Sequence, residues 1–436
     1  MESNRLTIIG GGLAGCEAAW QAAERGIDVT LFEMRPAVMT PAHESGLLAE
    51  LVCSNSLKSE LLTSAHGVLK AEISKLGSLV ISAAKETRVP AGQALAVDRE
   101  NFASLITQQI ENHPKIKVIR EEIKSIPTDR PLIIATGPLT SDALASDIAP
   151  LTGSEYLHFY DAIAPSIEAD SIDRSKCFQA ARYDRGNAYI NCPMTRDQYF
   201  EFRDAILAAE KTPLHDFEQK AQFFEGCLPI EELATRGPKT LAFGPMKPVG
   251  IRHPKTGEKY FAVVQLRQEN KEGTVYGLVG FQTRLKWPEQ ERVFKMIPGL
   301  ENAKFVRFGQ IHRNTYIDSP KLLSPTLQLR SDNQLFFAGQ LTGVEGYVES
   351  AATGIIAGIN ASRLLEGKEP VVLPKVTMLG SLISYITTAP IKQFQPMNAN
   401  FGIFPPLDVP EKKDEIKRAK MVERALAALD EWQKEL

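Results

Sequence analysis

The stretch Leu6-Thr7-Ile8-Ile9-Gly10-Gly11-Gly12-Leu13-Ala14-Gly15-Cys16-Glu17-Ala18-Ala19 sets the architecture that we expect for this chain. An apolar run rich in β-branched residues predicts a buried strand, and the pattern G-x-G-x-x-G follows it at once. An alanine-rich helical segment then runs to Arg25-Gly26, and a second strand over residues 28–32 ends at Glu33. Strand, helix, second strand and acidic terminus together predict a unit that binds a dinucleotide.

Each residue of this unit has a physical task. Gly10 permits the tight turn, Gly12 lets the backbone approach a pyrophosphate, and Gly15 lets the helix lie close to the strand. The helix N-terminus then faces the phosphates. Glu33 is expected to accept hydrogen bonds from the ribose hydroxyls. An ordinary glycine-rich turn is the other interpretation of the bare motif.

Composition restricts the class of protein. The chain has 436 residues, 43% of them hydrophobic and 24% charged, which indicates a globular protein of two domains or of one fold with an insertion. A net charge of −3 argues against a surface that coats nucleic acid, although a local basic patch is compatible with it. No apolar run is long enough to span a bilayer and no signal peptide precedes the first strand, so we expect a cytoplasmic protein without a membrane segment.

The number and spacing of the cysteines argue against disulfides and metal sites. There are five, an odd number, and none forms a C-x-x-C pair. Thiols in a reducing compartment are therefore expected, with no zinc site.

Helical patterns follow the first unit. Apolar residues at helical spacing, such as Leu69, Ile73 and Val80, predict one helix over residues 67–87. Asp98 is placed to cap the next helix, which is expected to run through Ile110.

Nucleotide-binding patterns recur later in the chain. Residues 131–138 form a short apolar strand that ends in Ala-Thr-Gly at Gly137, an ending that closes the nucleotide domain of many flavoproteins. Any buried strand that meets a turn is the alternative. Residues 335–338 form another strand, followed by Gly339, Gly343 and Gly346 ahead of a small-residue helix. We expect the strand at 335–338 to join the sheet that begins at residue 6.

The sequence pattern changes in the middle of the chain, where it predicts charged helices, glycine- and proline-rich turns and short strands. We therefore expect an inserted α+β module of residues 181–305 within a discontinuous nucleotide domain of residues 1–180 and 306–436. Basic residues lie in or beside its turns, and a solvated surface explains most of them better than a phosphate-contacting patch.

Five segments carry a resemblance to a known family. They are G-G-G-L-A-G-C-E-A-A, E-L-V-C-S-N-S-L, F-F-E-G-C-L-P-I-E, F-F-A-G-Q-L-T-G-V-E-G-Y-V-E-S-A-A-T-G and P-M-N-A-N-F-G. Together they resemble the bacterial folate- and FAD-dependent tRNA (uracil-5-)-methyltransferases over nearly the whole chain. The related flavoproteins that modify the tRNA wobble uridine share the first motif but are much longer.

The resemblance implies an α/β fold with a Rossmann-type, glutathione-reductase-like FAD domain. It implies transfer of a one-carbon unit from 5,10-methylenetetrahydrofolate to C5 of the T-loop uridine, position 54, of tRNA. Reduced FAD (FADH2) would be the direct reductant, and NADH or NADPH would reduce the oxidised FAD again. The residues expected at the cofactor are Gly10, Gly11, Gly12, Leu13, Ala14, Gly15, Glu33, Arg35, Gly137, Gly339, Gly343 and Gly346.

Two cysteines match the cysteine motifs of the family. Uracil C5 becomes nucleophilic only after a thiolate adds at C6, and a second group must later remove the C5 proton. We assign Cys227 as the nucleophile and Cys53 as the general acid/base, and the reverse assignment stays open. Cys16, Cys177 and Cys192 are interpreted as core thiols.

Other functions remain open at this point. A flavin-dependent NAD(P)H oxidoreductase without an RNA substrate, a wobble-uridine tRNA-modifying flavoprotein and a non-catalytic flavin-binding RNA module would share parts of the pattern. The sequence does not give the oligomeric state or the folate-contacting side chains.

Overall fold

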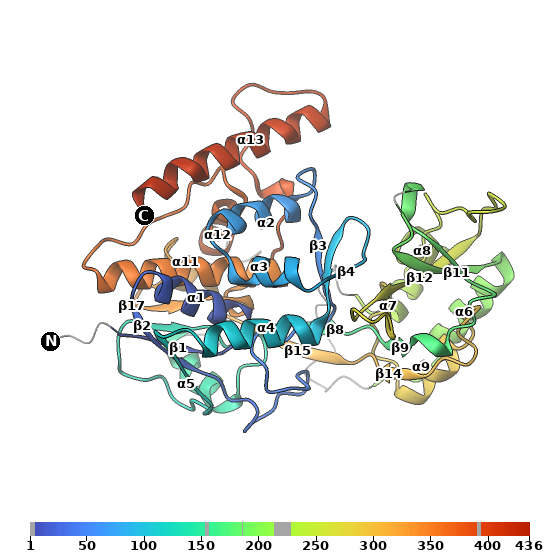
Figure 1. The fold of residues 1–436 in the computed structure, drawn as a ribbon, viewed down its shortest axis with the longest axis horizontal. Coiled ribbons are helices and arrows are strands. Elements are labelled where there is room, and N and C mark those ends of the chain that lie inside the picture. The colour runs from blue at the N-terminus through green and yellow to red at the C-terminus, as the bar shows by residue number, and fades with distance from the viewer. Residues whose placement is uncertain (1–4, 153–156, 185, 213–227, 390–393) are drawn as a thin grey trace.

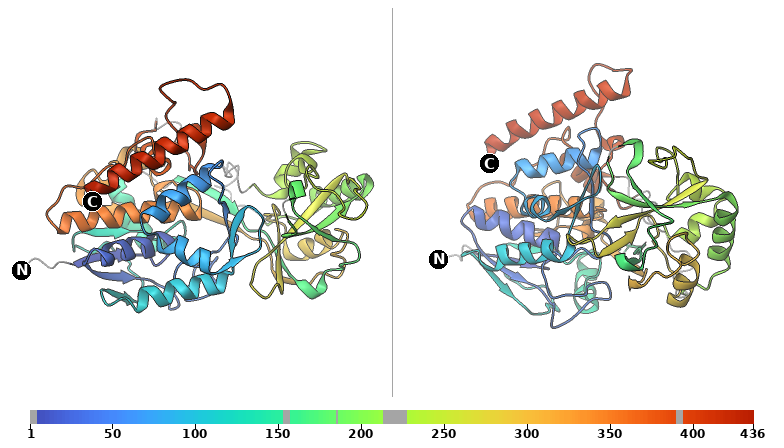
Figure 2. Two further views of the ribbon diagram at one scale, coloured as in Figure 1. Left: turned by 45° about the horizontal axis from the view of Figure 1, so that its top comes forward. Right: turned by 45° about the vertical axis from the view of Figure 1, so that its right-hand side comes forward.

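The computed structural model describes residues 5–152, 157–184, 186–212, 228–389 and 394–436. It has two lobes (Figure 1). One lobe contains both ends of the chain and a parallel sheet covered by helices, and the other contains an antiparallel sheet. In both views of Figure 2 the second lobe stays to one side of the first.

The parallel sheet forms the centre of the first lobe, which we call the nucleotide lobe. Its strand order is β16-β17-β7-β1-β2-β6, and every pair is parallel except β16–β17. The predicted strand at 335–338 pairs in this sheet with β7, which in turn pairs with β1, so the shared sheet is confirmed. The strands are β1 (Arg5–Ile9), β2 (Asp28–Phe32), β6 (Ile116–Ile119), β7 (Leu132–Ile134), β16 (Gln328–Leu329) and β17 (Asp332–Phe337).

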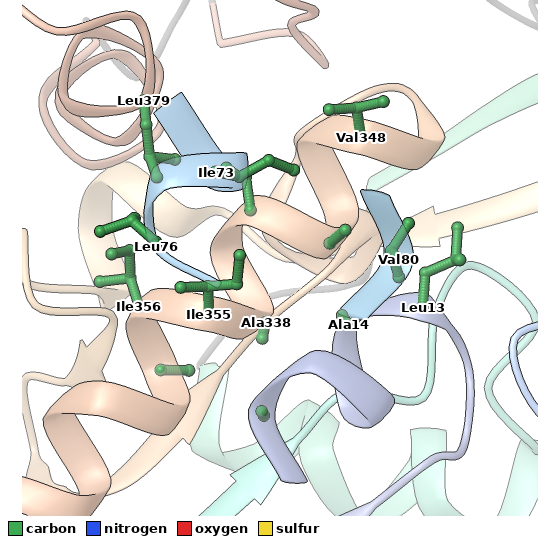
Figure 3. Close-up of a cluster of buried hydrophobic side chains, with 14 of the residues drawn as sticks. Leu13, Ala14, Ile73, Leu76, Val80, Ala338, Val348, Ile355, Ile356 and Leu379 are labelled. Atoms are coloured by element: carbon green, nitrogen blue, oxygen red, sulfur yellow. The ribbon is translucent and has the colours of Figure 1, made fainter. Parts of the chain in front are cut away.

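Small residues let the two central helices of this lobe pack closely. These are α1 (Leu13–Glu24) and α11 (Tyr347–Leu365). A Cβ atom at Gly354 would lie 2.1 Å from the Ala14 carbonyl oxygen, and one at Gly358 would lie 2.6 Å from that of Ala18. The contact therefore depends on glycine, and larger side chains such as Ile355 and Val348 extend the core on other sides of α11 (Figure 3).

Further helices cover the sheet. The expected single helix over 67–87 is wrong, because Gly77 adopts φ +75° and ends the first helix near it. Ser78 caps the second helix by accepting from Ile81 N, whereas the Asp98 cap is confirmed by its bond from Asn101 N. The helices are α2 (Ala65–Lys75), α3 (Leu79–Glu86), α4 (Arg99–Glu111), α5 (Asp142–Thr152), α10 (Ser319–Leu322), α12 (Met378–Thr388) and α13 (Asp414–Trp432).

The second lobe, which we call the module, is built on a six-stranded sheet in the order β10-β11-β12-β13-β9-β14. Its strands are β9 (Ser166–Glu168), β10 (Phe178–Ala180), β11 (Tyr189–Met194), β12 (Ala262–Gln268), β13 (Val275–Leu278) and β14 (Phe305–Arg307). Its helices are α6 (Arg196–Ala208), α7 (Ile230–Thr235), α8 (Thr240–Phe243) and α9 (Trp287–Phe294).

Two smaller sheets lie where the lobes meet. An antiparallel ribbon of β8 (Leu157–Ala162) and β15 (Ile311–Tyr316) carries the chain into and out of the module (Figure 1). A three-stranded sheet of β3 (Ser56–Ser59), β4 (Arg88–Val89) and β5 (Ala94–Val97) extends from the nucleotide lobe towards the module (Figure 1).

The division of the chain into residues 1–180 plus 306–436 and an insert of 181–305 stays a proposal. Because β9 and β10 already belong to the module's sheet, we propose that the insert begins nearer residue 163. Within the described ranges, no helix combines the length and the apolar character needed to cross a membrane.

Candidate active site

A cleft with about 1020 Å³ of empty space opens at the carboxyl ends of β1, β2, β7 and β17. Ligands of open α/β sheets bind at this edge, because the loops after parallel strands meet there. The lining includes Gly10, Gly12, Leu13, Ala14, Glu33, Arg35, Gly137 and Gly339 from the expected cofactor residues, and also Thr136, Gln340, Tyr347 and Ser350.

The N-terminus of α1 faces this first pocket. Gly12 is the N-cap and makes no side-chain capping bond, so the first N–H groups of the helix are available to a ligand. A Cβ atom built on Gly12 meets no protein atom within 4 Å, although the residue lines the pocket. The space that a side chain would fill is therefore pocket space, which fits the pyrophosphate of a dinucleotide.

The acidic residue at the end of β2 is held by protein donors. Glu33 accepts from Gly11 N at 2.8 Å through one oxygen, and from Arg35 N at 3.0 Å and Arg35 Nε at 2.9 Å through the other. Burial alone would raise the pKa of Glu33, but the hydrogen bond and charge of Arg35 hold it below its ordinary value. An ionised carboxylate with lone pairs to spare lines the pocket, as acceptance from ribose hydroxyls requires.

The other expected cofactor residues are distributed differently. Gly346 lines a second pocket, whereas Gly11, Gly15 and Gly343 line neither of the two. A Cβ at Gly15 would lie 1.8 Å from the Gly10 carbonyl oxygen, so this glycine serves packing of α1 against the turn. A Cβ at Gly343 would lie 2.5 Å from the Phe394 ring.

The second pocket continues from the first towards the module. Five residues line both pockets: Val52, Pro138, Leu139, Gln340 and Tyr347. The second pocket adds Cys53 from the nucleotide lobe, and Arg267 and Gln282 from the module. A ligand that fills the first pocket can therefore extend one end towards Cys53.

Tyr347 fixes the loop that carries Cys53. Its hydroxyl oxygen accepts from Cys53 N at 2.7 Å and from Ser54 N at 3.1 Å. On the module side, Arg307 donates to the carbonyl oxygens of Val52 at 3.1 Å and Cys53 at 3.4 Å. The backbone of the cysteine loop is thus held from both lobes.

Asn55 joins the same loop to strand β12. Its side-chain nitrogen donates to Val97 O at 2.9 Å and to Gln268 O at 3.0 Å, and its oxygen accepts from Arg267 Nε at 2.8 Å. Asn55 is fully buried, so it serves as a fixed support.

An ion pair reinforces this junction. Arg99 Nη2 lies 3.0 Å from Glu269 Oε1. Burial would raise the pKa of Glu269, but Arg99, Arg307 and Arg267 keep it below its ordinary value.

A histidine and a carboxylate also line the second pocket. His66 Nδ1 lies 3.2 Å from Glu349 Oε1, which also accepts from Ala399 N at 3.0 Å. Burial alone would raise the pKa of Glu349, yet the charge of Lys58 and the bond from His66 bring it to about 2. Lys58 adopts φ +63°, an uncommon conformation for a residue with a side chain, and it lines the pocket beside His66.

The remaining cysteines lie elsewhere or are not described. Cys16 is buried, and burial raises the pKa of its thiol. Cys177 and Cys192 lie 3.5 Å apart, sulfur to sulfur, in the module. Cys227 lies outside the described residues. Ile230, three positions later, donates its backbone N–H to Gln282 O at 2.7 Å, and Gln282 lines the second pocket with Cys53.

Sequence reasoning missed several lining residues. Tyr347 lies within the motif F-F-A-G-Q-L-T-G-V-E-G-Y, whose glycines were assigned to the cofactor while the tyrosine was not. Arg267, His66 and Lys58 had no local signal, because their neighbours in the pocket come from distant parts of the chain. Among the residues that the structure describes, no three His, Cys, Asp or Glu side chains gather as ligands of a metal ion would.

The chain is similar in sequence and in structure to known proteins. Residues 5–369 match the family model described as glucose inhibited division protein A. A methylenetetrahydrofolate–tRNA-(uracil-5-)-methyltransferase TrmFO of Geobacter sulfurreducens is 58% identical over 98% of both chains. The protein of the same name from Heliobacterium modesticaldum is 57% identical over 99% of this chain and 98% of its own. The crystal structure of Aquifex aeolicus GidA, form I, superposes with a TM-score of 0.70 at 19% identity, over 98% of this chain and 75% of that one.

Proposed function

Since the chain belongs to the glucose inhibited division protein A family and, within it, to the methylenetetrahydrofolate–tRNA-(uracil-5-)-methyltransferases, we propose that it methylates C5 of uridine 54 in the T-loop of tRNA. The methyl carbon comes from 5,10-methylenetetrahydrofolate. The observation that carries the proposal is the full-length identity of 58% to a relative of that name. The continuous pair of pockets with Cys53 in the second supports it.

The shape and the polar groups of the first pocket fit FAD. The N-terminus of α1 and the open space at Gly12 would receive the pyrophosphate, and Glu33 would accept from the ribose. When bound, reduced FAD supplies the electrons that bring the one-carbon unit to the methyl level. We further propose NADH or NADPH as the source of those electrons.

Cys53 and Cys227 have different roles in the reaction at uracil. Cys227 acts as the nucleophile that adds to C6, and Cys53 takes the C5 proton after transfer, so that the sulfur can leave. Two facts support the pairing: Cys53 lines the second pocket, and Ile230, close to Cys227 in sequence, is bonded to a residue of the same pocket. The reverse assignment is the alternative, and variants of both cysteines separate the two.

The experiment that tests the function uses a T-loop transcript and purified FAD-loaded protein. We expect 5-methyluridine at position 54 when methylenetetrahydrofolate and NADH or NADPH are supplied, and none when S-adenosylmethionine replaces the folate. A transcript with cytidine at position 54 is the control. Turnover of NADH or NADPH without methylation or tRNA binding would instead indicate a flavin oxidoreductase.

A further inference from the structure

Arg267 presents an unusual arrangement in the second pocket. Its side chain lines the pocket together with Cys53, and its Nε donates to Asn55 at 2.8 Å. Among the described residues, no protein acceptor takes the N–H groups of its two terminal nitrogens. A half-buried guanidinium with free donors requires an acceptor from water or from a ligand.

The protein fixes the direction of this guanidinium. Asn55 is fully buried and is bonded to Val97 O and Gln268 O, so its oxygen can hold Nε in one place. The carboxylate nearest in sequence, Glu269, is instead bonded to Arg99 and accepts from Ser166 Oγ at 2.8 Å. The structure therefore keeps the free end of Arg267 for the pocket.

The chemistry at uracil creates an acceptor beside the cysteines. When the thiolate sulfur bonds to C6, the electrons of the C5–C6 double bond move towards C4, and negative charge develops on O4. C5 then bonds to the one-carbon unit and the C4 carbonyl reforms. Loss of the C5 proton to the base accompanies cleavage of the bond between the one-carbon unit and its donor nitrogen, and a hydride equivalent, for which reduced FAD would be the source, brings that carbon to the methyl level as the C6–sulfur bond breaks. A donor aimed at O4 lowers the barrier, because it binds the oxygen more strongly as charge develops.

We propose that Arg267 is a catalytic residue that donates to O4 of the target uracil and stabilises the enolate formed by thiolate addition. The inference rests on the proposed function. Arg267 is tied through Asn55 to the loop of Cys53, which acts at C5, the carbon next to C4. Because Arg267 and Cys53 line the same pocket, a uracil whose C5 lies at Cys53 has its C4 carbonyl close to the same pocket wall residues.

The folate carboxylates are the competing acceptors in this pocket. Lys58 and His66 line the same pocket as Glu349 and carry side-chain nitrogens that can donate to a carboxylate. They can serve a carboxylate without Arg267. The experiment includes the folate concentration as a variable, so that this occupant gives a different result.

The test uses the holoenzyme with T-loop RNA that carries 5-fluorouracil at position 54. Such RNA has no C5 proton to lose, so the protein–RNA adduct accumulates and its single-turnover rate reports addition and transfer. At saturating RNA and folate, Arg267→Gln should slow adduct formation by roughly 10²–10³-fold, with little change in the Kd for RNA. Arg267→Lys should recover part of the rate, because it keeps the charge without the fork.

The matched control is Arg292→Gln, an exposed arginine of the module that pairs with Glu289. It should form the adduct at the normal rate. FAD content and the unfolding temperature are measured for every variant. A normal adduct rate in folded Arg267→Gln, or a defect that extra methylenetetrahydrofolate removes, would overturn the proposal.

A change in the substrate tests the same contact with the native enzyme. RNA with 4-thiouridine replaces O4 by a weaker acceptor, and methyl transfer to it is compared in native protein and in Arg267→Lys. The two changes should be less than additive if Arg267 contacts O4, and additive effects would contradict it. Absence of methylation by the native protein on ordinary T-loop RNA would instead refute the proposed function itself.

Discussion

The two connected pockets differ in how their polar groups are satisfied. In the first, Glu33 already accepts from Gly11 and Arg35, and recognition falls to backbone N–H groups and to the space at Gly12. In the second pocket, the terminal nitrogens of Arg267 have N–H groups without a protein acceptor among the described residues. The backbone of Lys58 adopts a positive φ, which is uncommon for a residue with a side chain. A pocket whose side chains are largely satisfied within the protein holds a resident cofactor through backbone N–H groups and shape, whereas a pocket with a free side-chain donor is suited to substrates that bind and dissociate.

The largest effect should come from filling the first pocket. Gly12→Val should abolish FAD binding, because its side chain would occupy the path of the pyrophosphate. The flavin absorbance of the purified protein measures this. Gly15→Ala is the contrast: its Cβ would strike the Gly10 carbonyl and should destabilise the apoprotein by about 1–3 kcal/mol. Full flavin content in Gly12→Val would refute the pocket assignment.

The cysteines of the second pocket should give the next largest effects. Cys227→Ala should eliminate the denaturation-resistant adduct with 5-fluorouracil RNA along with turnover. Cys53→Ala should still add to the base, while methyl transfer to ordinary RNA falls by roughly 10²–10⁴-fold. A denaturing gel separates the species.

Cys177→Ala, in the module but outside the pockets, is the control for these variants. If Cys53→Ala loses the adduct and Cys227→Ala keeps it, the two roles are exchanged. An adduct in both variants would exclude both cysteines as the nucleophile.

Removal of the carboxylate in the first pocket should have a moderate effect. Glu33→Ala should weaken FAD binding by about 1–3 kcal/mol, through lost hydrogen bonds to ribose and a released Arg35. Titration of the apoprotein with FAD measures it. Glu111→Ala, which removes an exposed partner of Arg120, should bind FAD normally. Equal affinity for FAD in the two variants would mean that Glu33 stabilises the protein loop and does not contact the ribose.

The smallest effect should come from Tyr347→Phe. Loss of the hydroxyl leaves Cys53 N and Ser54 N without their acceptor and should lower the free energy of unfolding by about 1 kcal/mol. The rate of methyl transfer should fall by a larger factor than the Kd for FAD rises, because the loop that Tyr347 holds carries Cys53. Tyr385→Phe, whose hydroxyl bonds Gln395 O at an exposed site, is the control. If both variants transfer methyl groups equally well, Tyr347 does not position the loop.

The sequence predicted the nucleotide sheet because its signals are local. Strand, glycine turn and acidic terminus lie within residues 6–33, and the later strand at 335–338 carries a similar ending. The break at Gly77 was missed, since apolar spacing continues across it while the backbone conformation does not. Arg267 was missed for a different reason: Asn55, which orients it, lies 212 positions away in the chain. Long-range partners of this kind leave no periodicity to detect.

The position of β17 between β7 and β16 has a consequence for biosynthesis. The ribosome releases β7, which ends at Ile134, long before β17, which ends at Phe337. At typical translation rates the interval is roughly 10 to 40 s, during which the β7 edge of the nascent sheet has no neighbour. The module is completed within that interval, since its last strand ends at Arg307. The nascent chain therefore has to keep an open sheet edge from pairing with other chains while its inserted lobe folds.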